Sequence, residues 1–501
     1  MATLLQHPVL EVVRTAIPQG ISVYLVGGAV RDELLGKSTH DFDFVVSAEA
    51  LQIARKVANK LRGAFYPLDN RRQYGRVIWN TPAGERLKLD FALQAGDSIE
   101  EDLVQRDFTI NALAIDLRNT ERWIDPLRGA QDLLAKSLRA CSEQAFQNDP
   151  LRVVRGVRFA LSLRFRIEPA TWHRMLAASP SLSSVSSERL AEELFRLLSG
   201  RSVASAVRLL DRVGALPYTF PELIPLKEVE QSPPHHQDAY QHTLEVVGRL
   251  EEILEVLSLP FEEERHANLA MGLASLHLGR YRSKIDSYLE ERFTPERNKC
   301  ALLFLAALYH DSGKALTGSK DENNLWHFFS HEQVSAKLCE RRGRELALAN
   351  DEIEWMRKVV LHHMRPIFLT QTGEAPSRRA VYRFFRQTGE TGIGVCLLSL
   401  ADVLGIYGYT LPTSLWSRHL DVVRKLLQAW WEEKEEQISP PPLLDGHEVM
   451  QRFGITPGPL IGKILEGIRE AQAAGEIHSK EEALALAEKV IAAERSHRLS
   501  G

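Results

Sequence analysis

Residues 23–32 read VYLVGGAVRD, and residues 41–46 read DFDFVV. The first stretch predicts a short apolar strand that ends in Gly27-Gly28 and continues into a helix, Ala29–Leu35. The second predicts another strand, Phe42–Val46. Glycines at a strand-to-helix turn let backbone N–H groups approach a phosphate. The two stretches therefore predict an α+β unit with an anion-binding turn.

Two aspartates lie in the second of these strands. Asp41 and Asp43 are two residues apart, so both side chains point to one face. Paired carboxylates suit Mg²⁺, and two-metal nucleotidyl transfer needs such a pair for the attacking hydroxyl and the leaving pyrophosphate. Asp90, on the predicted strand Leu87–Leu93, is the candidate third carboxylate. An isolated Asp-x-Asp pair is more often a surface feature, but the glycine turn and Arg31, which can clamp a triphosphate, favour a catalytic site.

The rest of the chain predicts a sequence of domains. The first part mixes strands and helices, whereas the pattern from about residue 130 is almost entirely helical. Proline-rich breaks at Gln231–Pro234 and Ser439–Pro442 divide the helical part. We expect an α+β head with a small mixed sheet and helices, followed by an all-α neck, a second helical domain and a helical tail. The predicted boundaries are 1–130, 131–225, 226–435 and 436–501.

Composition narrows the class of protein. The chain has 501 residues, 44% hydrophobic residues, a net charge of −4 and four scattered cysteines. No apolar run reaches the roughly 20 residues that span a bilayer, and the first residues do not resemble a secretory leader. These features predict a cytoplasmic protein without a disulfide framework or a membrane partner. The sequence carries no signal for an oligomeric state.

The glycine turn and the aspartate pair resemble the head-domain signature of class II tRNA nucleotidyltransferases and bacterial poly(A) polymerases, within the polymerase-β-like superfamily. The resemblance covers about residues 20–225. It rests on five motifs in order, at residues 27–43, 102–112, 125–129, 148–159 and 187–193.

The resemblance implies a template-independent enzyme that adds nucleotides to the 3′ end of tRNA, with CTP and possibly ATP as substrates. It implies Mg²⁺ at Asp41 and Asp43, and catalysis by these two residues with Asp90. Asp149 and Arg152 would read the Watson–Crick edge of the nucleotide, because residues three apart on a helix share a face. The implied nucleotide-binding residues are Gly27, Gly28, Arg31, Arg106, Asp149, Arg152, Arg155 and Arg158.

Helix amphipathicity alone also explains the spacing of the last three arginines. Two positions depart from the family pattern: Gln105 replaces an arginine, and Asn148 replaces an acidic residue.

The segment after Asp90 bears on which nucleotide is added. Full CCA-adding relatives carry a long flexible loop there, whereas only Phe91–Glu100 precedes the second motif in this chain. The short connection resembles the CC-adding branch, since a loop lever suits a switch from C to A recognition. We therefore favour CC addition. The alternatives are a full CCA-adding enzyme and an A-adding enzyme or poly(A) polymerase.

A second cluster of candidate ligands lies in the helical part. Its members, in chain order, are His242, His310, Asp311, His331, the adjacent pair His362/His363, and Asp402. Single histidines are usually core residues, but this ordered set resembles an HD-domain phosphohydrolase. The resemblance implies a divalent transition metal or Mg²⁺. One of the adjacent pair His362/His363 would be a ligand, and we take His362. Lys314 could stabilise a phosphate oxygen. The predicted metal ligands are His242, His310, Asp311, His331, His362 and Asp402.

Two further predictions remain open. Pro459 begins a predicted tail helix after Gly458, and Lys463 there could bind an RNA phosphate; an ordinary helix-turn-helix without RNA contact explains the pattern equally well. The alternative for the whole chain is an HD phosphohydrolase whose head only binds nucleotide. The intact Asp41/Asp43 pair argues against it.

Overall fold

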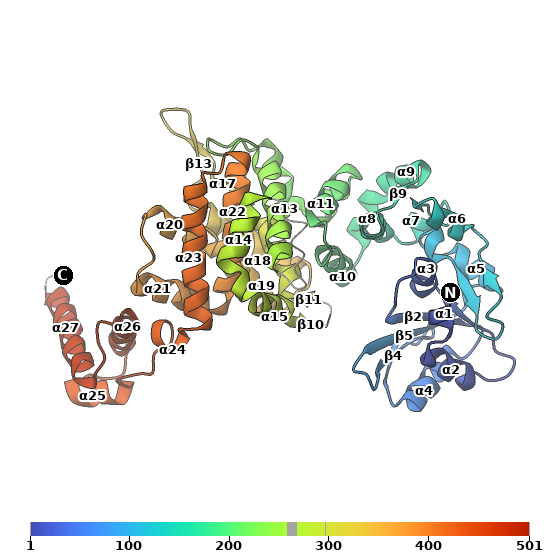
Figure 1. Cartoon of the computed structure of the whole chain (residues 1–501), viewed down its shortest axis with the longest axis horizontal. Helices are drawn as coiled ribbons and strands as arrows, with labels where there is room; N and C mark the ends of the chain where they lie inside the picture. The colour runs from blue at the N-terminus through green and yellow to red at the C-terminus, as the bar shows by residue number, and fades with distance from the viewer. Residues whose placement is uncertain (1, 258–267, 296, 500–501) are drawn as a thin grey trace. The chain divides into compact units, whose positions relative to one another are not determined.

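A seven-stranded mixed sheet forms the centre of the head (Figure 1). The computed structural model describes residues 2–257, 268–295 and 297–499. Strands β2 and β5 run parallel, and all other neighbours in the order β3-β4-β5-β2-β1-β6-β7 are antiparallel. The strands are β1 Val23–Val26, β2 Asp41–Val46, β3 Ala64–Asp69, β4 Tyr74–Asn80, β5 Arg86–Leu93, β6 Ala114–Asp116 and β7 Trp123–Ile124.

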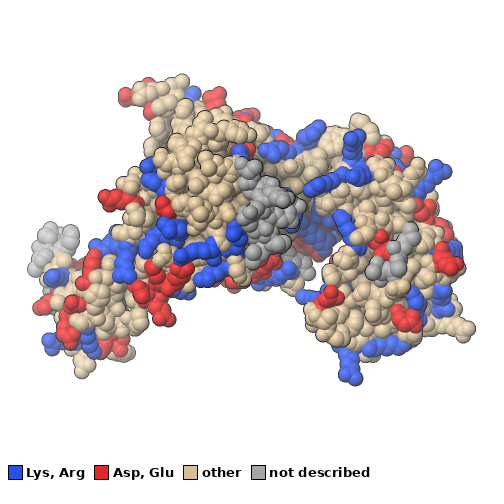
Figure 2. Space-filling view, viewed as in Figure 1, with Lys and Arg blue, Asp and Glu red and all other residues tan. Residues whose placement is uncertain are grey.

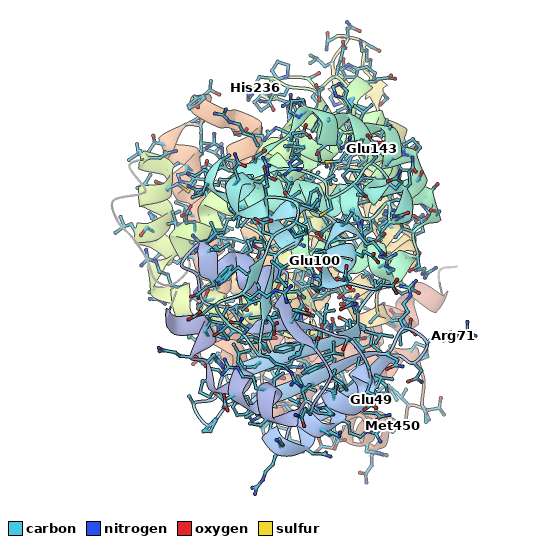
Figure 3. All side chains as sticks on the ribbon, turned by 90° about the vertical axis from the view of Figure 1, so that its right-hand side faces the viewer. Glu49, Arg71, Glu100, Glu143, His236 and Met450 are labelled. Carbon is cyan, nitrogen blue, oxygen red and sulfur yellow. The ribbon has the colours of Figure 1, made fainter. Side chains whose placement is uncertain are left out.

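Helix α4, Ala50–Leu61, packs on this sheet against β4 and β5. Its buried residues include Ile53, Val57 and Leu61, which recur every four residues and so form one apolar stripe. The sequence predicts a hairpin of Arg76–Trp79 and Leu87–Leu93 around Pro82-Ala83-Gly84, and the antiparallel pairing of β4 and β5 confirms it. At the sheet edge, the side chain of Arg71 projects outward from the β3–β4 turn (Figure 3). The other helices of the head are α1 Ala2–Leu5, α2 Pro8–Ala16, α3 Gly28–Leu34, α5 Ile99–Val104 and α6 Gly129–Leu134.

The neck is helical, as predicted. Its central helix α8 begins at Arg152 and buries Val153, Val157 and Phe159. The chain divides into two units, Met1–Glu193 with Arg208–Thr219, and Leu194–Val207 with Phe220–Gly501. Two neck helices therefore contribute residues to both units. The neck helices are α7 Ala145–Asn148, α8 Arg152–Leu163, α9 Pro169–Ala178, α10 Ser187–Leu198 and α11 Val203–Arg212.

The second unit is built around two apolar helices, α16 and α22. Every residue of α22 from Gly392 to Gly405 is buried, as are nearly all of α16. Within the described residues, the stretch Arg378–Thr410 alone is long and apolar enough to cross a membrane, and 83% of its apolar window is buried in the fold. This degree of burial is typical of a helix in the core of a folded protein. The main helices are α13 Ala239–Leu257, α14 Leu269–Leu278, α16 Lys299–Tyr309, α18 His331–Glu345, α19 Asn350–His362, α20 Arg365–Gln371, α21 Arg378–Thr388, α22 Gly392–Tyr407 and α23 Thr413–Trp431.

The tail has an apolar core of its own, which includes Val449, Ile464 and Ile491. Helix α26 begins at Pro459 after Gly458, as the sequence predicts. The tail helices are α25 Gly446–Phe453, α26 Pro459–Ala474 and α27 Lys480–Leu499.

The tail contacts α21 through ion pairs. Acidic and basic groups lie side by side in this region of Figure 2, which Figure 1 labels α21, α24 (Lys434–Gln437) and α26. The arginines of α21 pair with glutamates of the tail: Arg379 with Glu470 and Glu476, Arg383 with Glu470, and Arg386 with Glu466.

Candidate functional site

The two head aspartates occupy different environments on β2. Asp41 is exposed at the start of the strand, and its carboxylate lies 2.8 Å from the ammonium of Lys88. Asp43 lies opposite Asp90 in the parallel register of β2 and β5. Burial, and then the charge of Asp90, raise the pKa of Asp43. Among the described residues no hydrogen-bond donor reaches the Asp43 carboxylate, so this acidic group fits a cation.

Asp90 is held in place from the strand on its other side. Arg76 Nε and a terminal guanidinium nitrogen donate to its two oxygens over 2.8 and 3.0 Å. The hydroxyl of Tyr74 donates to Asp90 Oδ2 over 2.7 Å, and burial with the Asp90 charge raises the pKa of Tyr74. These contacts fix the third carboxylate toward Asp43. That Asp90 acts in catalysis stays a prediction.

The predicted glycine turn lies directly beside these carboxylates. Gly27 has φ +73°, and a Cβ there would lie 3.2 Å from an Arg106 guanidinium nitrogen and 3.4 Å from Asp43 Oδ2. Only glycine permits both this backbone conformation and this close approach. Arg106 is oriented by Asp102, which accepts its Nε–H over 3.1 Å. The structure therefore brings the turn, Arg106 and Asp43 together.

A polar network joins the turn to the neck. Arg31 donates to Asn111 over 2.8 Å, and Asn111 donates to Asp107 over 3.1 Å. Arg155 then donates two hydrogen bonds to Asp107, at 3.0 and 2.7 Å. Burial opposes ionisation of Asp107, but Arg155 and Asn111 outweigh it and lower its pKa to about 2.

The network continues to Glu193, a buried residue of α10 that is paired with both Arg155 and Arg158. The resemblance implies that these two arginines bind the nucleotide, and in the structure both have buried carboxylate partners. Their contact with a nucleotide stays a prediction. Asp107, Asn111 and Glu193 were not singled out as site residues, although all three lie in the quoted motifs.

The predicted base-reading pair has a different geometry from the expected one. Asp149 is not helical: its backbone is extended, φ −151° and ψ 97°, because Pro150 follows it. The expectation that Asp149 and Arg152 share a helix face is therefore wrong. Arg152 donates to the backbone carbonyls of Gln105, Arg106 and Ala145 over 2.8–3.1 Å.

Arg189 is a further residue that the sequence did not assign to this site. Its guanidinium donates to Asp149 Oδ2 over 2.8 Å. It comes from the fifth motif, so motif membership was the available signal.

The second candidate site is a buried cluster in the helical unit. Asp311 Oδ2 lies 3.3 Å from the Nε2 atoms of His242 and His310, and Asp311 Oδ1 lies 3.1 Å from His331 Nε2. Asp402 Oδ1 lies 3.1 Å from His242 Nε2. Two groups of three converging ligand atoms result, and both share Asp311.

The chemistry of these donors fits divalent metal. His310, His331 and His363 each direct Nδ1 to a backbone carbonyl at 2.7–2.8 Å, which leaves Nε2 free to face the cluster. Within the described part of the chain, these three Nε2 atoms are buried without a hydrogen-bond partner. Burial opposes protonation of His310, but the carboxylates raise its pKa to about 10. Buried histidine and carboxylate atoms that converge without partners are typical ligands of a divalent cation.

The choice of His362 as a ligand is wrong. His363 is fully buried, and its Nε2 lies 3.9 Å from Asp311 Oδ1. His362 is half-buried and lines the adjoining cavity, where burial and then Arg365 and Arg357 lower its pKa to about 4. Neighbouring residues at a helix end point about 100° apart, so only one of the two can face the cluster.

A cavity of about 1050 Å³ opens beside the cluster. Lys314 lies at this junction, with Nζ 2.7 Å from Asp311 Oδ2. His235 also lines the cavity, with its ring centroid 5.0 Å from that of His242. The sequence predicts only a proline break in this region, so His235 was not among the predicted site residues. In the tail, Lys463 is paired with Glu494, so its predicted RNA contact competes with an ion pair.

Comparison with known proteins gives three matches to family models. A poly(A) polymerase head domain matches residues 23–139, a probable RNA- and SrmB-binding site of polymerase A matches residues 164–226, and an HD domain matches residues 239–405.

Curated relatives match almost the whole chain. An A-adding tRNA nucleotidyltransferase of Deinococcus radiodurans is 31% identical over 93% of this chain and 94% of its own length. A CC-adding tRNA nucleotidyltransferase of Thermus thermophilus is 31% identical over 92% of each chain. A CC-adding tRNA nucleotidyltransferase of Geobacter sulfurreducens is 29% identical over 93% and 91%.

Solved structures show the same fold. A CCA-adding enzyme in complex with ATP superposes with a TM-score of 0.60 at 22% identity, over 97% of this chain and 94% of that chain. A Thermotoga maritima CCA-adding enzyme complexed with tRNA gives a TM-score of 0.54 at 21% identity, over 97% and 98%. The predicted fold class is confirmed: an α+β head followed by helical domains.

Proposed function

Because the chain belongs to the family of tRNA nucleotidyltransferases, we propose that it adds cytidine from CTP to the 3′ end of tRNA and stops before the terminal adenosine. The 3′ hydroxyl of the tRNA loses its proton to solvent and its oxygen forms a bond to the α-phosphorus of CTP. The bond from that phosphorus to the bridging oxygen breaks, and pyrophosphate leaves. We place this reaction in the cytoplasm. Mg²⁺ held by Asp41 and Asp43 would activate the hydroxyl and neutralise the triphosphate.

The chain's own residues prepare the nucleotide site. Gly27 lets the β1–α3 turn approach Asp43 and Arg106, so a triphosphate there would meet backbone N–H groups and a guanidinium. Arg31 is held near the same turn by Asn111 and Asp32. Arg76 and Tyr74 keep Asp90 directed at Asp43. Little side-chain reorganisation is then needed when CTP binds, which favours catalysis.

One observation supports cytidine specificity: hydrogen bonds hold the segment between β5 and α5 in one conformation. The N–H of Ala95 donates to Asp102 over 3.0 Å, and that of Asp97 donates to Glu101 over 2.9 Å. Gly96 has φ +82°, and a Cβ there would lie 2.3 Å from Glu101 Oε2. A short segment fixed in this way cannot act as the lever that a switch from C to A recognition requires.

Addition of A alone is the second candidate for the head, because the Deinococcus radiodurans relative named A-adding is as similar as the Thermus relative named CC-adding, at 31% identity each. Three tRNA substrates separate the candidates: one that lacks CCA, one that ends in C and one that ends in CC. Labelled CTP and ATP are each offered with Mg²⁺. We expect two cytidines on the first, one on the second and nothing on the third.

Incorporation of labelled A into the CC-ended tRNA would contradict CC specificity. If the chain also incorporates CTP, the result indicates CCA addition; if it does not, the result indicates addition of A alone. If neither label is incorporated into any tRNA, the transferase proposal itself fails.

We further propose that the helical unit hydrolyses phosphate esters. The convergence of three partnerless Nε2 atoms on Asp311 supports a metal-dependent hydrolase rather than a purely structural domain. The Asp41→Ala variant should then lose addition and keep hydrolysis, and the His310→Ala variant should do the reverse. Loss of both activities in either variant would contradict two independent sites.

A further inference from the structure

The cavity beside the His–Asp cluster is larger than a phosphate group requires. Its volume of about 1050 Å³ is at the upper end of the range for small-molecule pockets. Its lining includes Asp311, Asp402 and His331 of the cluster, together with further side chains of α18, α19 and α20. A ligand that fills it must extend well beyond the metal cluster.

Two cations of the cavity lining have no acidic partner among the described residues. Among the described residues, no carboxylate forms an ion pair with Lys337 of α18 or Arg365 of α20. Arg365 is half-buried, donates to the side chain of Gln387, and lies over the Phe384 ring at 5.8 Å. A partly desolvated guanidinium without a counter-charge is unfavourable unless an anionic ligand supplies one.

The other two cations of the cavity are already neutralised. Lys314 pairs with Asp311 at 2.7 Å, and Arg357 forms a two-pronged pair with Glu354 at 2.7 and 2.9 Å. The contrast singles out Lys337 and Arg365 as the pair available to an anion.

Acidic residues in the cavity wall do not cancel this charge. Glu340 is paired with Arg344, outside the cavity lining. Glu332 lies 3.9 Å from His331 Nδ1, on the edge of that ring opposite the Nε2 atom that faces the metal cluster. Lys337 lies six residues after His331 on α18, about 9 Å along the helix axis, so an anion bound by Lys337 and Arg365 is a second anion, separate from one at the cluster.

Aromatic rings supply the remaining wall. Phe329 is 75% exposed and Phe368 is 54% exposed, although both line the cavity. Lys320 covers the Trp326 ring and Lys314 covers the Phe328 ring. One face of Phe329 stacks on His327, with 5.5 Å between the ring centroids, which leaves its other face for a ligand. Exposed aromatic faces beside basic groups suit the stacking of a nucleobase.

We propose that the cavity is a two-phosphate site for a ribonucleotide: the phosphate to be hydrolysed lies at the His–Asp cluster, a second phosphate contacts Lys337 and Arg365, and the base stacks on Phe329 and Phe368. The proposal rests on the hydrolase function proposed above. In the reaction, a water oxygen bonds to phosphorus and the bond from phosphorus to the ribose oxygen breaks. The ribose oxygen takes a proton from the water, and inorganic phosphate leaves.

Two sources carry this chemistry, a free nucleoside 3′,5′-bisphosphate and an RNA with a 3′-phosphate. The test uses the full metal-loaded chain with adenosine 3′-monophosphate, adenosine 3′,5′-bisphosphate and a 3′-phosphorylated RNA trinucleotide, and measures phosphate release. We expect a KM at least about tenfold lower for the two larger substrates, which is the scale of one charge-assisted contact. The better of the two identifies the source. Equal KM values for all three would overturn the proposal.

Variants separate the second phosphate from the reaction. Arg365→Ala and Lys337→Ala should each raise the KM for the bisphosphate about tenfold and leave kcat and the monophosphate KM unchanged. Lys358→Ala is the matched control, because Lys358 lies on α19, pairs with Glu354 and does not line the cavity. An equal effect of Arg365→Ala on both substrates would indicate a structural role and contradict the proposal.

Binding gives a readout that does not depend on hydrolysis. Calorimetric titration of the chelator-treated chain with adenosine 3′,5′-bisphosphate should show binding that weakens about tenfold in Arg365→Ala. Binding without any hydrolysis by the loaded chain would reject the hydrolase function and retain the two-phosphate site. Hydrolysis of the monophosphate with no preference for a second phosphate would retain the hydrolase function and reject the two-phosphate site.

Discussion

Asp43 and Asp90 lie directly opposite each other on the parallel strands β2 and β5, and the charge of Asp90 adds to burial in raising the pKa of Asp43. Arg76 and Tyr74 bind both oxygens of Asp90, whereas Asp43 has no hydrogen-bond donor among the described residues. The carboxylate that lacks a partner is therefore the one next to the glycine turn. This asymmetry between two acidic groups favours Asp43 as the cation ligand.

Asp43→Asn should abolish nucleotide addition, by at least about a thousandfold, because a metal ligand contributes several kcal/mol to the transition state. The same change should raise the melting temperature of the metal-free protein at neutral pH. The folded pKa of Asp43 lies above its unfolded value of 3.8, so its contribution to stability is complete below that value and is lost as pH rises through the folded pKa.

The measurements are CTP incorporation and thermal unfolding at pH 4 and pH 7.5. Glu121→Gln, an exposed change in the head, is the control. An unchanged melting temperature at pH 7.5 would mean that the ionised Asp43 carries no cost.

Arg155→Ala should destabilise the head by about 3 kcal/mol, because it leaves the buried Asp107 without its main counter-charge. The depressed pKa of Asp107, about 2, adds a pH dependence with a definite sign. Its stabilising contribution is present above pH 4 and is lost as pH falls from about 4 toward 2. Urea unfolding across this range should show the loss in the unaltered chain and not in Asp107→Asn. Arg166→Ala, an exposed change in the neck, should have little effect.

How much of this arrangement follows from sequence depends on the range of the interaction. The strands, the hairpin and the glycine turn follow from local patterns. The extended Asp149 was also predictable, since Pro150 restricts the residue before it. By contrast, the Arg155–Asp107 pair joins residues 48 apart. No local sequence pattern distinguishes Arg155 from an arginine that binds a phosphate. The choice between His362 and His363 needed the orientation of α19 about its axis, which packing sets.

Asp102→Asn tests the role of the hydrogen-bonded segment between β5 and α5. Asp102 accepts hydrogen bonds from the Ala95 N–H and from Arg106 Nε, so its charge links the segment to the nucleotide site. We expect the KM for CTP to rise about tenfold or more, the scale of one charge-assisted hydrogen bond. Glu100→Ala on the same helix, labelled in Figure 3, has only a 3.8 Å contact with Arg122 and serves as the control. A KM for CTP that stays unchanged in Asp102→Asn would show that Arg106 does not depend on this carboxylate.

His363→Ala and His362→Ala form a matched pair of adjacent substitutions. His363 is fully buried, directs Nδ1 to the Val360 carbonyl and turns Nε2 toward Asp311, as a ligand requires. His362 lies in the cavity wall and contributes no atom to the cluster. We therefore expect His363→Ala to lower both metal content and phosphate release by at least about a hundredfold, and His362→Ala to keep its metal. Elemental analysis of the dialysed proteins measures the metal independently of the substrate. Circular dichroism shows whether the His363 variant still folds. A folded His363→Ala protein with full metal content, or a His362→Ala protein that has lost its metal, would reverse the assignment of this ligand.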